Sequence, residues 1–173
     1  MKKFMLIALA LVMVFALCAC GDDPVNTDPT GTTGGNQVSN EPKGYTFTHN
    51  NVKIGVDVAA ADVIAKLGEA DDKFTSASCA FGGNDTVYYY GSSVQISTND
   101  ELGYERIFSI YLADDLVSTE EGVCIGDSAD QVKSAYGEPG DKSNDNSLVY
   151  EKDGMTLTFI LNDGTVSSIR YDA

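Results

Sequence analysis

The chain has 173 residues, 43% of them hydrophobic, and this length allows one domain or two small tandem units. Its 26 acidic residues outnumber its 11 basic ones, which gives a formal net charge of −15. A surface of this sign repels phosphate groups, so the charge argues against nucleic acid and anionic lipid headgroups as partners.

The first residues have the pattern of an exported protein. Two lysines follow the first methionine, and an apolar run then extends from Phe4 to Ala19. The run is shorter than the roughly 20 residues of a membrane-spanning helix. We therefore interpret residues 1–19 as a signal peptide. Its removal takes away two basic residues and no acid, so the net charge becomes −17.

The apolar run ends in a sequence that resembles the lipobox of bacterial lipoproteins. Leu17 lies three residues before Cys20, and the small Ala19 lies directly before it. The resemblance implies that Cys20 carries a diacylglycerol with palmitate-like chains, which anchors the protein to the outer side of the cell membrane. Cys18 fits poorly, because Leu17 would then occupy the small-residue position. The alternative is an ordinary signal peptide with two incidental cysteines.

Residues 20–43 have the composition of a disordered tether. Gly, Pro, Thr and Asn dominate this segment, and almost no side chain in it is apolar. Burial therefore cannot offset the conformational entropy that ordering the segment would cost. We expect the folded part to begin at about residue 44.

From residue 45 onward the sequence repeats itself, which predicts a duplicated unit. We assign residues 44–119 to repeat 1 and residues 120–173 to repeat 2. The matching segments are 54–57 with 125–128, 63–70 with 132–139, and 107–111 with 166–170.

A short helix is predicted at the start of each repeat. In repeat 2, Ser128 and Gln131 form a capping box before a helix at about 129–136. In repeat 1, the apolar spacing predicts a helix at about 58–67, with Asp57 as its N-terminal cap.

Three hairpin-linked strands are predicted after each helix, from period-two alternation and turn residues. They cover about 86–90, 94–98 and 106–112 in repeat 1, and about 148–151, 156–161 and 166–171 in repeat 2. This order predicts an α+β fold in which two helix-plus-meander repeats form one antiparallel sheet with the helices on one face.

The alternation divides the strand residues into two predicted faces. The core face consists of Val87, Tyr89, Val94, Ile96, Phe108, Ile110, Leu112, Leu148, Tyr150, Leu157, Phe159, Leu161, Ile169 and Tyr171. The opposite face consists of Tyr88, Tyr90, Gln95, Ser97, Ile107, Ser109, Tyr111, Thr156, Thr158, Ile160 and Arg170. The second face carries few charges although the protein is strongly acidic, which favours a binding role for it.

The pattern Ile-Gly-x-Ser-x-x-x-Val-x-x-x-Tyr-Gly-Glu-Pro at residues 125–139, with the strands that follow it, resembles known repeat domains. It is similar to β-lactamase-inhibitory-protein-like domains and to small outer-membrane-assembly (SmpA/OmlA-type) lipoproteins. Residues 45–173, including segment 78–85, also resemble uncharacterised lipoproteins of Gram-positive anaerobes. The resemblance implies side-by-side helix-plus-sheet units whose open sheet face binds protein. No inhibitory motif is matched, so inhibition of β-lactamase is not implied.

No arrangement of residues in the sequence predicts catalysis, a cofactor or a metal site. His49 is the single histidine and has no second histidine or cysteine at ligand spacing. Neighbouring acidic residues in a strand point to opposite faces, which makes them poor acid–base pairs. Cys79 and Cys124 either form a disulfide outside the cell or remain as buried free thiols, and two cysteines alone do not decide between these.

Tyr88, Tyr90, Tyr111 and Arg170 are the candidate partner-binding residues, because tyrosine and arginine are enriched at the centres of interfaces. The alternative is that the tyrosines only fill the sheet through cross-strand packing. We expect a lipid-anchored, non-catalytic module at the cell surface that binds a protein or peptide. The alternatives are a structural or assembly lipoprotein of an envelope complex and an enzyme acting on the cell wall.

Overall fold

The computed structural model describes residues 41–173. The predicted signal peptide, Cys20 and the tether up to residue 40 lie outside the described residues. In the described range the chain forms two helices and ten strands: β1 (Phe47–His49), β2 (Val52–Ile54), β3 (Val58–Ala59), α1 (Ala60–Leu67), β4 (Asp72–Ala77), β5 (Asn84–Tyr90), β6 (Val94–Asn99), β7 (Arg106–Leu112), α2 (Ala129–Tyr136), β8 (Ser147–Lys152), β9 (Met155–Asn162) and β10 (Thr165–Asp172).

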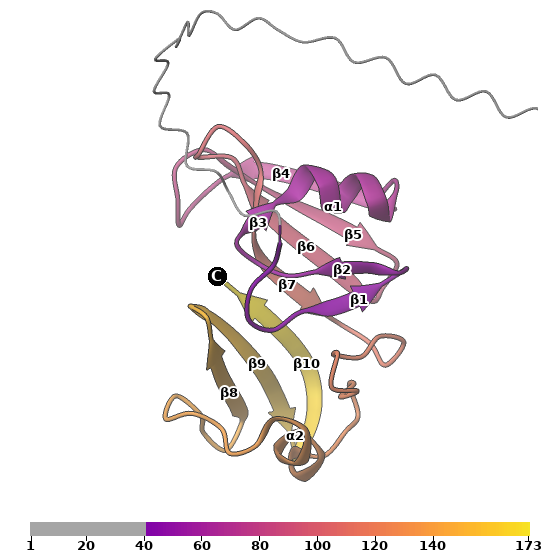
Figure 1. Ribbon diagram of the computed structural model, residues 1–173, viewed down its shortest axis with the longest axis vertical. Helices are drawn as coiled ribbons and strands as arrows, with labels where there is room; N and C mark the ends of the chain where they lie inside the picture. Colours follow the sequence, from indigo (N-terminus) through magenta and orange to yellow (C-terminus); the bar gives the residue numbers. More distant parts are fainter. Residues whose placement is uncertain (1–40) are drawn as a thin grey trace, which may run out of the picture. The chain divides into compact units, whose positions relative to one another are not determined.

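One antiparallel sheet organises the fold, with its strands in the order β4-β5-β6-β7-β10-β9-β8. The short β3 pairs with the start of β7, and β1 and β2 form a separate hairpin. The predicted α+β class, mainly antiparallel sheet with two helices, is confirmed. Figure 1 shows α1 and the β1–β2 hairpin over β5–β7, and α2 at one end of β9 and β10.

Both helices pack on the same face of the sheet. The Tyr90 hydroxyl donates to the carbonyl of Gly68 at the end of α1, at 3.4 Å. The Tyr150 hydroxyl donates to the carbonyl of Gly137 at the end of α2, at 3.1 Å. Val63 of α1 and Val132 of α2 belong to one buried cluster with the sheet residues beneath them. The opposite face of the sheet therefore remains available, and we call it the open face.

The two helices begin in different ways. Helix α2 has the predicted bounds, and its capping box between Ser128 and Gln131 is present. Helix α1 begins at Ala60, later than predicted, because β3 pairs with β7 up to Ala59. Asp57 is therefore not the cap; it has φ = 60° and forms an ion pair with Arg106 at 2.9 Å. Ala59 is the N-cap residue, and its methyl side chain cannot accept a hydrogen bond from the helix.

This difference in capping predicts opposite effects of two substitutions. Ser128→Ala removes the acceptor for the Gln131 N–H and should cost about 1 kcal/mol of unfolding free energy. Ala59→Ser adds an acceptor at a residue that already has cap-like backbone angles, φ = −64° and ψ = 128°, and should stabilise. Urea denaturation of both variants measures the two signs, and a loss of stability in Ala59→Ser would contradict the prediction.

All six predicted strands are present, and all but the third are longer than predicted. Four strands were not predicted, namely β1, β2, β3 and β4. β3 has two residues, too few for a pattern. Every residue of β4 is exposed, so its sequence shows no apolar alternation.

The predicted face assignment of β5 is wrong. Tyr88 and Tyr90 are only 7% and 6% exposed and lie on the core face. Val87 and Tyr89 alternate with them, are half-buried, and lie on the open face. Both sets of residues are large and apolar, so the alternation within β5 alone fits either phase, and a one-residue error exchanges the two faces.

The prediction is also wrong at the start of β7, where Ile107 is fully buried and Phe108 is only half-buried. The cause is a β-bulge. Ser97 pairs with Ser109 and Thr98 pairs with Ile107, so Phe108 is the extra residue. A bulge changes the phase of the alternation, which lets Ile107 and Ile110 both reach the core.

Candidate binding surface

A row of side chains crosses five strands of the open face. Tyr89 of β5 lies opposite Gln95 of β6, which lies opposite Tyr111 of β7. Tyr111 lies opposite Arg170 of β10, which lies opposite Thr158 of β9. Directly opposed residues of an antiparallel sheet are close enough for their side chains to touch. Thr158 is buried, so the side chains from Tyr89 to Arg170 form the accessible part of the row, and Asp72 of β4 lies opposite Tyr89 beyond its end.

Arg170 is held in place within this surface. Its Nε donates to Asp172 Oδ2 at 2.6 Å, and the Ser109 hydroxyl donates to Asp172 Oδ1 at 2.8 Å. The Arg170 side chain is 55% exposed. No other hydrogen bond holds the guanidinium within residues 41–173. A guanidinium oriented in this way can still donate to a carboxylate of a partner.

Large apolar side chains flank the row at both ends. Phe74 of β4 is 60% exposed and lies opposite Val87. Ile160 of β9 is 40% exposed and lies opposite Ser168. Beyond the start of β7, the rings of Phe81 and Phe108 pack edge to face at 5.3 Å. Aromatic and aliphatic groups in such positions supply the area that an interface buries.

The structure brings together two of the four predicted partner-binding residues. Tyr111 and Arg170 are directly opposed on the open face. Tyr88 lies in the core instead, where its hydroxyl donates to Glu105 at 2.6 Å and Lys73 Nζ lies 5.0 Å from the ring centroid. Burial, and then the Glu105 hydrogen bond, raise the pKa of Tyr88. Tyr90 is buried beside the end of α1, so both tyrosines are packing residues.

Tyr89 and Phe74 lie on the open face but were not predicted there. For Tyr89 a signal was available, because β5 ends at Tyr90 and the pairing across the 91–93 turn places Tyr90 opposite Val94. Val94 was assigned to the core, so Tyr90 belongs there too and Tyr89 belongs on the open face. For Phe74 no signal was available, because β4 itself was not recognisable.

Neighbouring acidic residues occur at 71–72, 114–115 and 120–121, and each pair contributes a structural hydrogen bond. Asp71 accepts the Gly91 N–H at 2.6 Å, and Glu120 accepts the Thr48 hydroxyl at 2.6 Å. Asp114 accepts the hydroxyls of Ser92 and Ser93 at 2.7 and 2.8 Å. Among the described residues no group of three His, Cys, Asp or Glu side chains could hold a metal ion.

Asp114 gives the stability a predictable pH dependence. The Ser92 hydroxyl lowers its pKa most, and the Ser93 hydroxyl and the Leu116 N–H add to this, so the pKa lies below the ordinary value of 3.8. A carboxyl group whose pKa is lower in the folded state than in the unfolded state stabilises the folded protein at pH values above the unfolded-state pKa. This stabilisation is lost as the pH falls through the folded-state pKa. Asp114→Ala should therefore unfold at a lower temperature than wild type at neutral pH, with a difference that shrinks in acid. Thermal melts from neutral pH to roughly pH 2 measure this.

Asp115 provides the matched control, because it is the exposed neighbour in the same turn. Asp115→Ala should leave the pH profile close to that of wild type. Equal acid profiles for the two variants would show that the Ser92 and Ser93 hydrogen bonds do not set the effect.

Cys79 and Cys124 are free thiols, so the disulfide alternative is not found. Cys79 lies in the loop between β4 and β5, and Cys124 lies in the segment between β7 and α2. The alternative of buried thiols fits only Cys124, which is half-buried, since Cys79 is exposed. Burial, and then Asp127, raise the pKa of Cys124.

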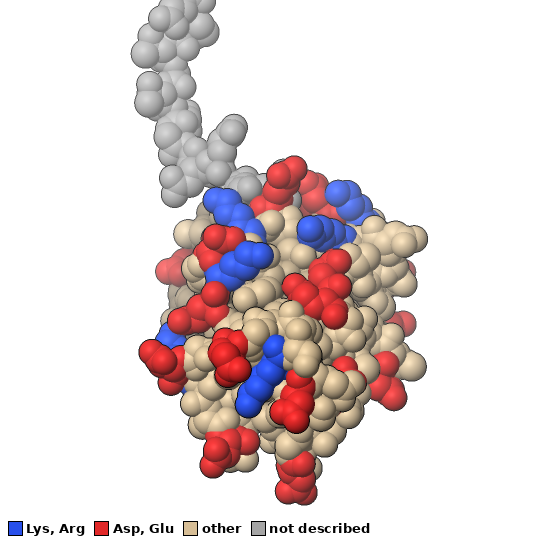
Figure 2. Space-filling view, turned by 60° about the horizontal axis from the view of Figure 1, so that its bottom comes forward, with Lys and Arg blue, Asp and Glu red and all other residues tan. Residues whose placement is uncertain are grey.

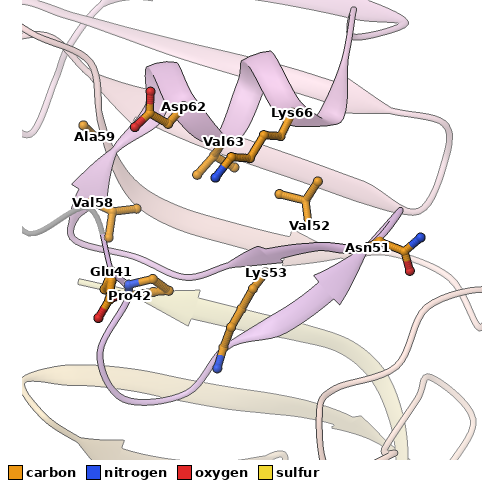
Figure 3. A pocket seen from close by; sticks show the side chains of 10 residues that line it. All are labelled: Glu41, Pro42, Asn51, Val52, Lys53, Val58, Ala59, Asp62, Val63 and Lys66. Carbon is orange, nitrogen blue, oxygen red and sulfur yellow. The ribbon is translucent and has the colours of Figure 1, made fainter. Parts of the chain in front are cut away.

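A pocket of about 490 Å³ lies between α1 and the β1–β2 hairpin (Figure 3). Three valines line it together with two lysines and two carboxylates: Val52, Val58, Val63, Lys53, Lys66, Glu41 and Asp62. The opposite charges balance, so the lining does not select an anion or a cation. On the side of the molecule shown in Figure 2, acidic side chains are spread among uncharged atoms and basic ones are fewer.

Among the described residues, no helix combines the length and the apolar character that crossing a membrane requires. Comparison of the chain with protein-family models, curated proteins and solved structures found no match.

Proposed function

We propose that the protein is a lipid-anchored, non-catalytic module that binds a protein or peptide through the open face of its sheet. One observation carries this proposal. Two helices and a hairpin shield one face, while the other presents Tyr89, Gln95, Tyr111 and Arg170 in a continuous row. Arg170 is the charged residue of this row, and Asp172 beside it partly neutralises it.

The tandem arrangement is part of the proposal, and equivalent hydrogen bonds in the two halves support it. In each half, the segment at the start of the helix donates two backbone hydrogen bonds to the start of the third strand. In the first half, Asp57 N donates to Ile107 O and Ala60 N donates to Glu105 O. In the second half, Gly126 N donates to Val166 O and Ala129 N donates to Gly164 O. A tyrosine hydroxyl also donates to the glycine carbonyl that ends each helix. We infer two copies of one unit, joined where β7 pairs with β10.

The anchor rests on the lipobox-like sequence at Cys20, which lies outside the described residues. A lipid on Cys20 and a polar tether would present the open face to partners outside the membrane. No catalytic role is proposed, since the acidic residues described above form structural hydrogen bonds, and Asp172, which accepts the Ser109 hydroxyl on the open face, is engaged with Arg170.

Site-specific photocrosslinking in cells tests the proposal. A photoreactive phenylalanine analogue replaces Tyr89 or Tyr111 in the full-length lipoprotein, and matched controls carry it at Ala61 of α1 or Ala135 of α2, both exposed on the helices. Crosslinks to one partner from the open face, and none from the helices, are expected. Equal crosslinking from both sets would refute the open face as the binding surface.

The identity of the crosslinked partner separates the two leading functions. A single extracellular protein or peptide favours the binding module, and co-purification with a membrane complex favours an assembly role.

Arg170→Ala together with Tyr111→Ala should abolish the crosslink from position 89 while the thermal unfolding midpoint stays close to that of wild type.

A further inference from the structure

We infer that two copies of this chain pair through β4, edge to edge, and extend the sheet across a two-fold axis. This goes beyond the proposed function, because it uses the edge of the sheet and leaves the open face free. All six residues of β4 are exposed, and β4 pairs on one side only, with β5. An exposed strand edge is a template for another strand.

The other end of the sheet is covered by the chain itself. Gly140 N donates to Val149 O at 2.8 Å, and Val149 N donates to Ser143 Oγ at 2.8 Å. The segment 140–143 thereby satisfies both backbone groups of Val149 on the outer edge of β8. No comparable segment of the described chain lies along β4, so β4 is the more open end of the sheet for an added strand.

The hydrogen-bonding groups of β4 that face outward can be identified. Asp71 N donates to Tyr89 O, so the backbone of Tyr89 bonds toward β4. Asp100 N donates to Asn84 O, so the backbone of Asn84 bonds toward the β6 side instead. Backbone groups of successive strand residues point to opposite edges, so those of Lys73, Thr75 and Ala77 point away from β5. In agreement, Lys73 N donates to its neighbour Asp72 Oδ1 at 2.8 Å instead of to the ladder.

This geometry restricts how two β4 strands can pair. Directly opposed residues must lie on the same face, and outward-pointing residues must oppose one another. With Phe74 opposite its own copy, Lys73 lies opposite Thr75 and Asp72 opposite Ser76. The register with Lys73 opposite its copy places like charges together and is disfavoured. The register with Thr75 opposite its copy avoids this but places Phe74 opposite Ser76. The Phe74 register alone of the three places the two Phe74 rings together without opposing like charges.

The outward-facing backbone groups of Lys73, Thr75 and Ala77 provide the attraction, and Phe74 adds an apolar contact in the favoured register. Its side chain is 60% exposed in the monomer, and pairing would stack it against its copy. Asp72 must release the Lys73 N–H, which then joins the new ladder. The net charge of −15 opposes association of two copies, so the dimer should become stronger as salt rises. A partner recruited by charge would show the opposite salt dependence.

Cysteine crosslinking of the full-length chain in the membranes of expressing cells tests the register. In a Cys79→Ser, Cys124→Ser background, Phe74→Cys places two thiols across the axis in a non-hydrogen-bonded pair, where Cα atoms lie about 4.5 Å apart. Mild oxidation should give at least roughly tenfold more covalent dimer than Asp72→Cys, Ser76→Cys or the exposed control Leu116→Cys, because only Phe74 meets the disulfide distance limit.

A second variant tests whether the pairing uses the backbone. Thr75→Pro removes an outward-facing N–H without removing a bond to β5, and proline is tolerated at such edge positions. Added to Phe74→Cys, it should abolish the covalent dimer while the circular dichroism melt persists. Equal crosslinking at Phe74 and Leu116, a maximum at Ser76, or weaker crosslinking at high salt would each overturn the inference. Loss of the dimer with intact photocrosslinking at Tyr111 would leave the proposed function standing.

Discussion

Replacement of Phe159 by alanine is expected to destabilise the domain by roughly 3–5 kcal/mol. Phe159 is fully buried, and its ring centroid lies 5.2 Å from that of Tyr136 and 6.0 Å from that of Tyr150. Alanine would leave a cavity that these rings cannot fill and would remove two aromatic contacts. The loss is a large fraction of the 5–15 kcal/mol that typically stabilises a folded domain.

Urea denaturation measures this effect, and the next residue provides the control. Ile160 belongs to the same strand but is 40% exposed on the open face. Ile160→Ala should therefore cost less than roughly 1 kcal/mol. Similar losses for the two variants would contradict the placement of the core on the helix side of the sheet.

The second large effect is expected at Tyr88. Tyr88→Ala should cost roughly 3–5 kcal/mol, because it empties a buried site and leaves Glu105 without its hydroxyl donor. Tyr89→Ala, one residue along the same strand, should cost less than about 1 kcal/mol but should weaken partner binding. Chemical denaturation combined with photocrosslinking from position 111 measures both properties.

Tyr88→Phe separates the two parts of the Tyr88 effect. It keeps the ring in the core and removes only the hydrogen bond to Glu105, which should cost roughly 1–3 kcal/mol. If Tyr89→Ala unfolded the domain and Tyr88→Ala did not, the faces of β5 would be the reverse of those described here.

The helices and six of the strands could be predicted because their signals are local. The capping box and the terminal glycine fix α2 within its own sequence, whatever it packs against. The start of α1 could not be found in this way, because residues 58–59 pair with β7, which lies more than forty residues further along the chain. Pairing across such a separation leaves no mark in the sequence around residue 58.

The faces of the strands were harder to predict than the strands themselves. Val87 and Tyr89 are as apolar as Tyr88 and Tyr90, so hydrophobicity does not choose between the phases. At Phe108 the alternation is broken by a bulge, which depends on the partner strand β6. For the candidate site, Tyr111 and Arg170 were placed correctly on the open face, whereas Tyr88 and Tyr90 were not.

The central position of β10 has a consequence for how the protein reaches its native state. Both neighbours of β10, β7 and β9, precede it along the chain, and it joins the two meanders through its pairing with β7. A chain that folds from its N-terminus can form separate hairpins early. It cannot close the sheet until residues 165–172 are available. The closing step is thus non-local, and we expect it to be the slow step of folding.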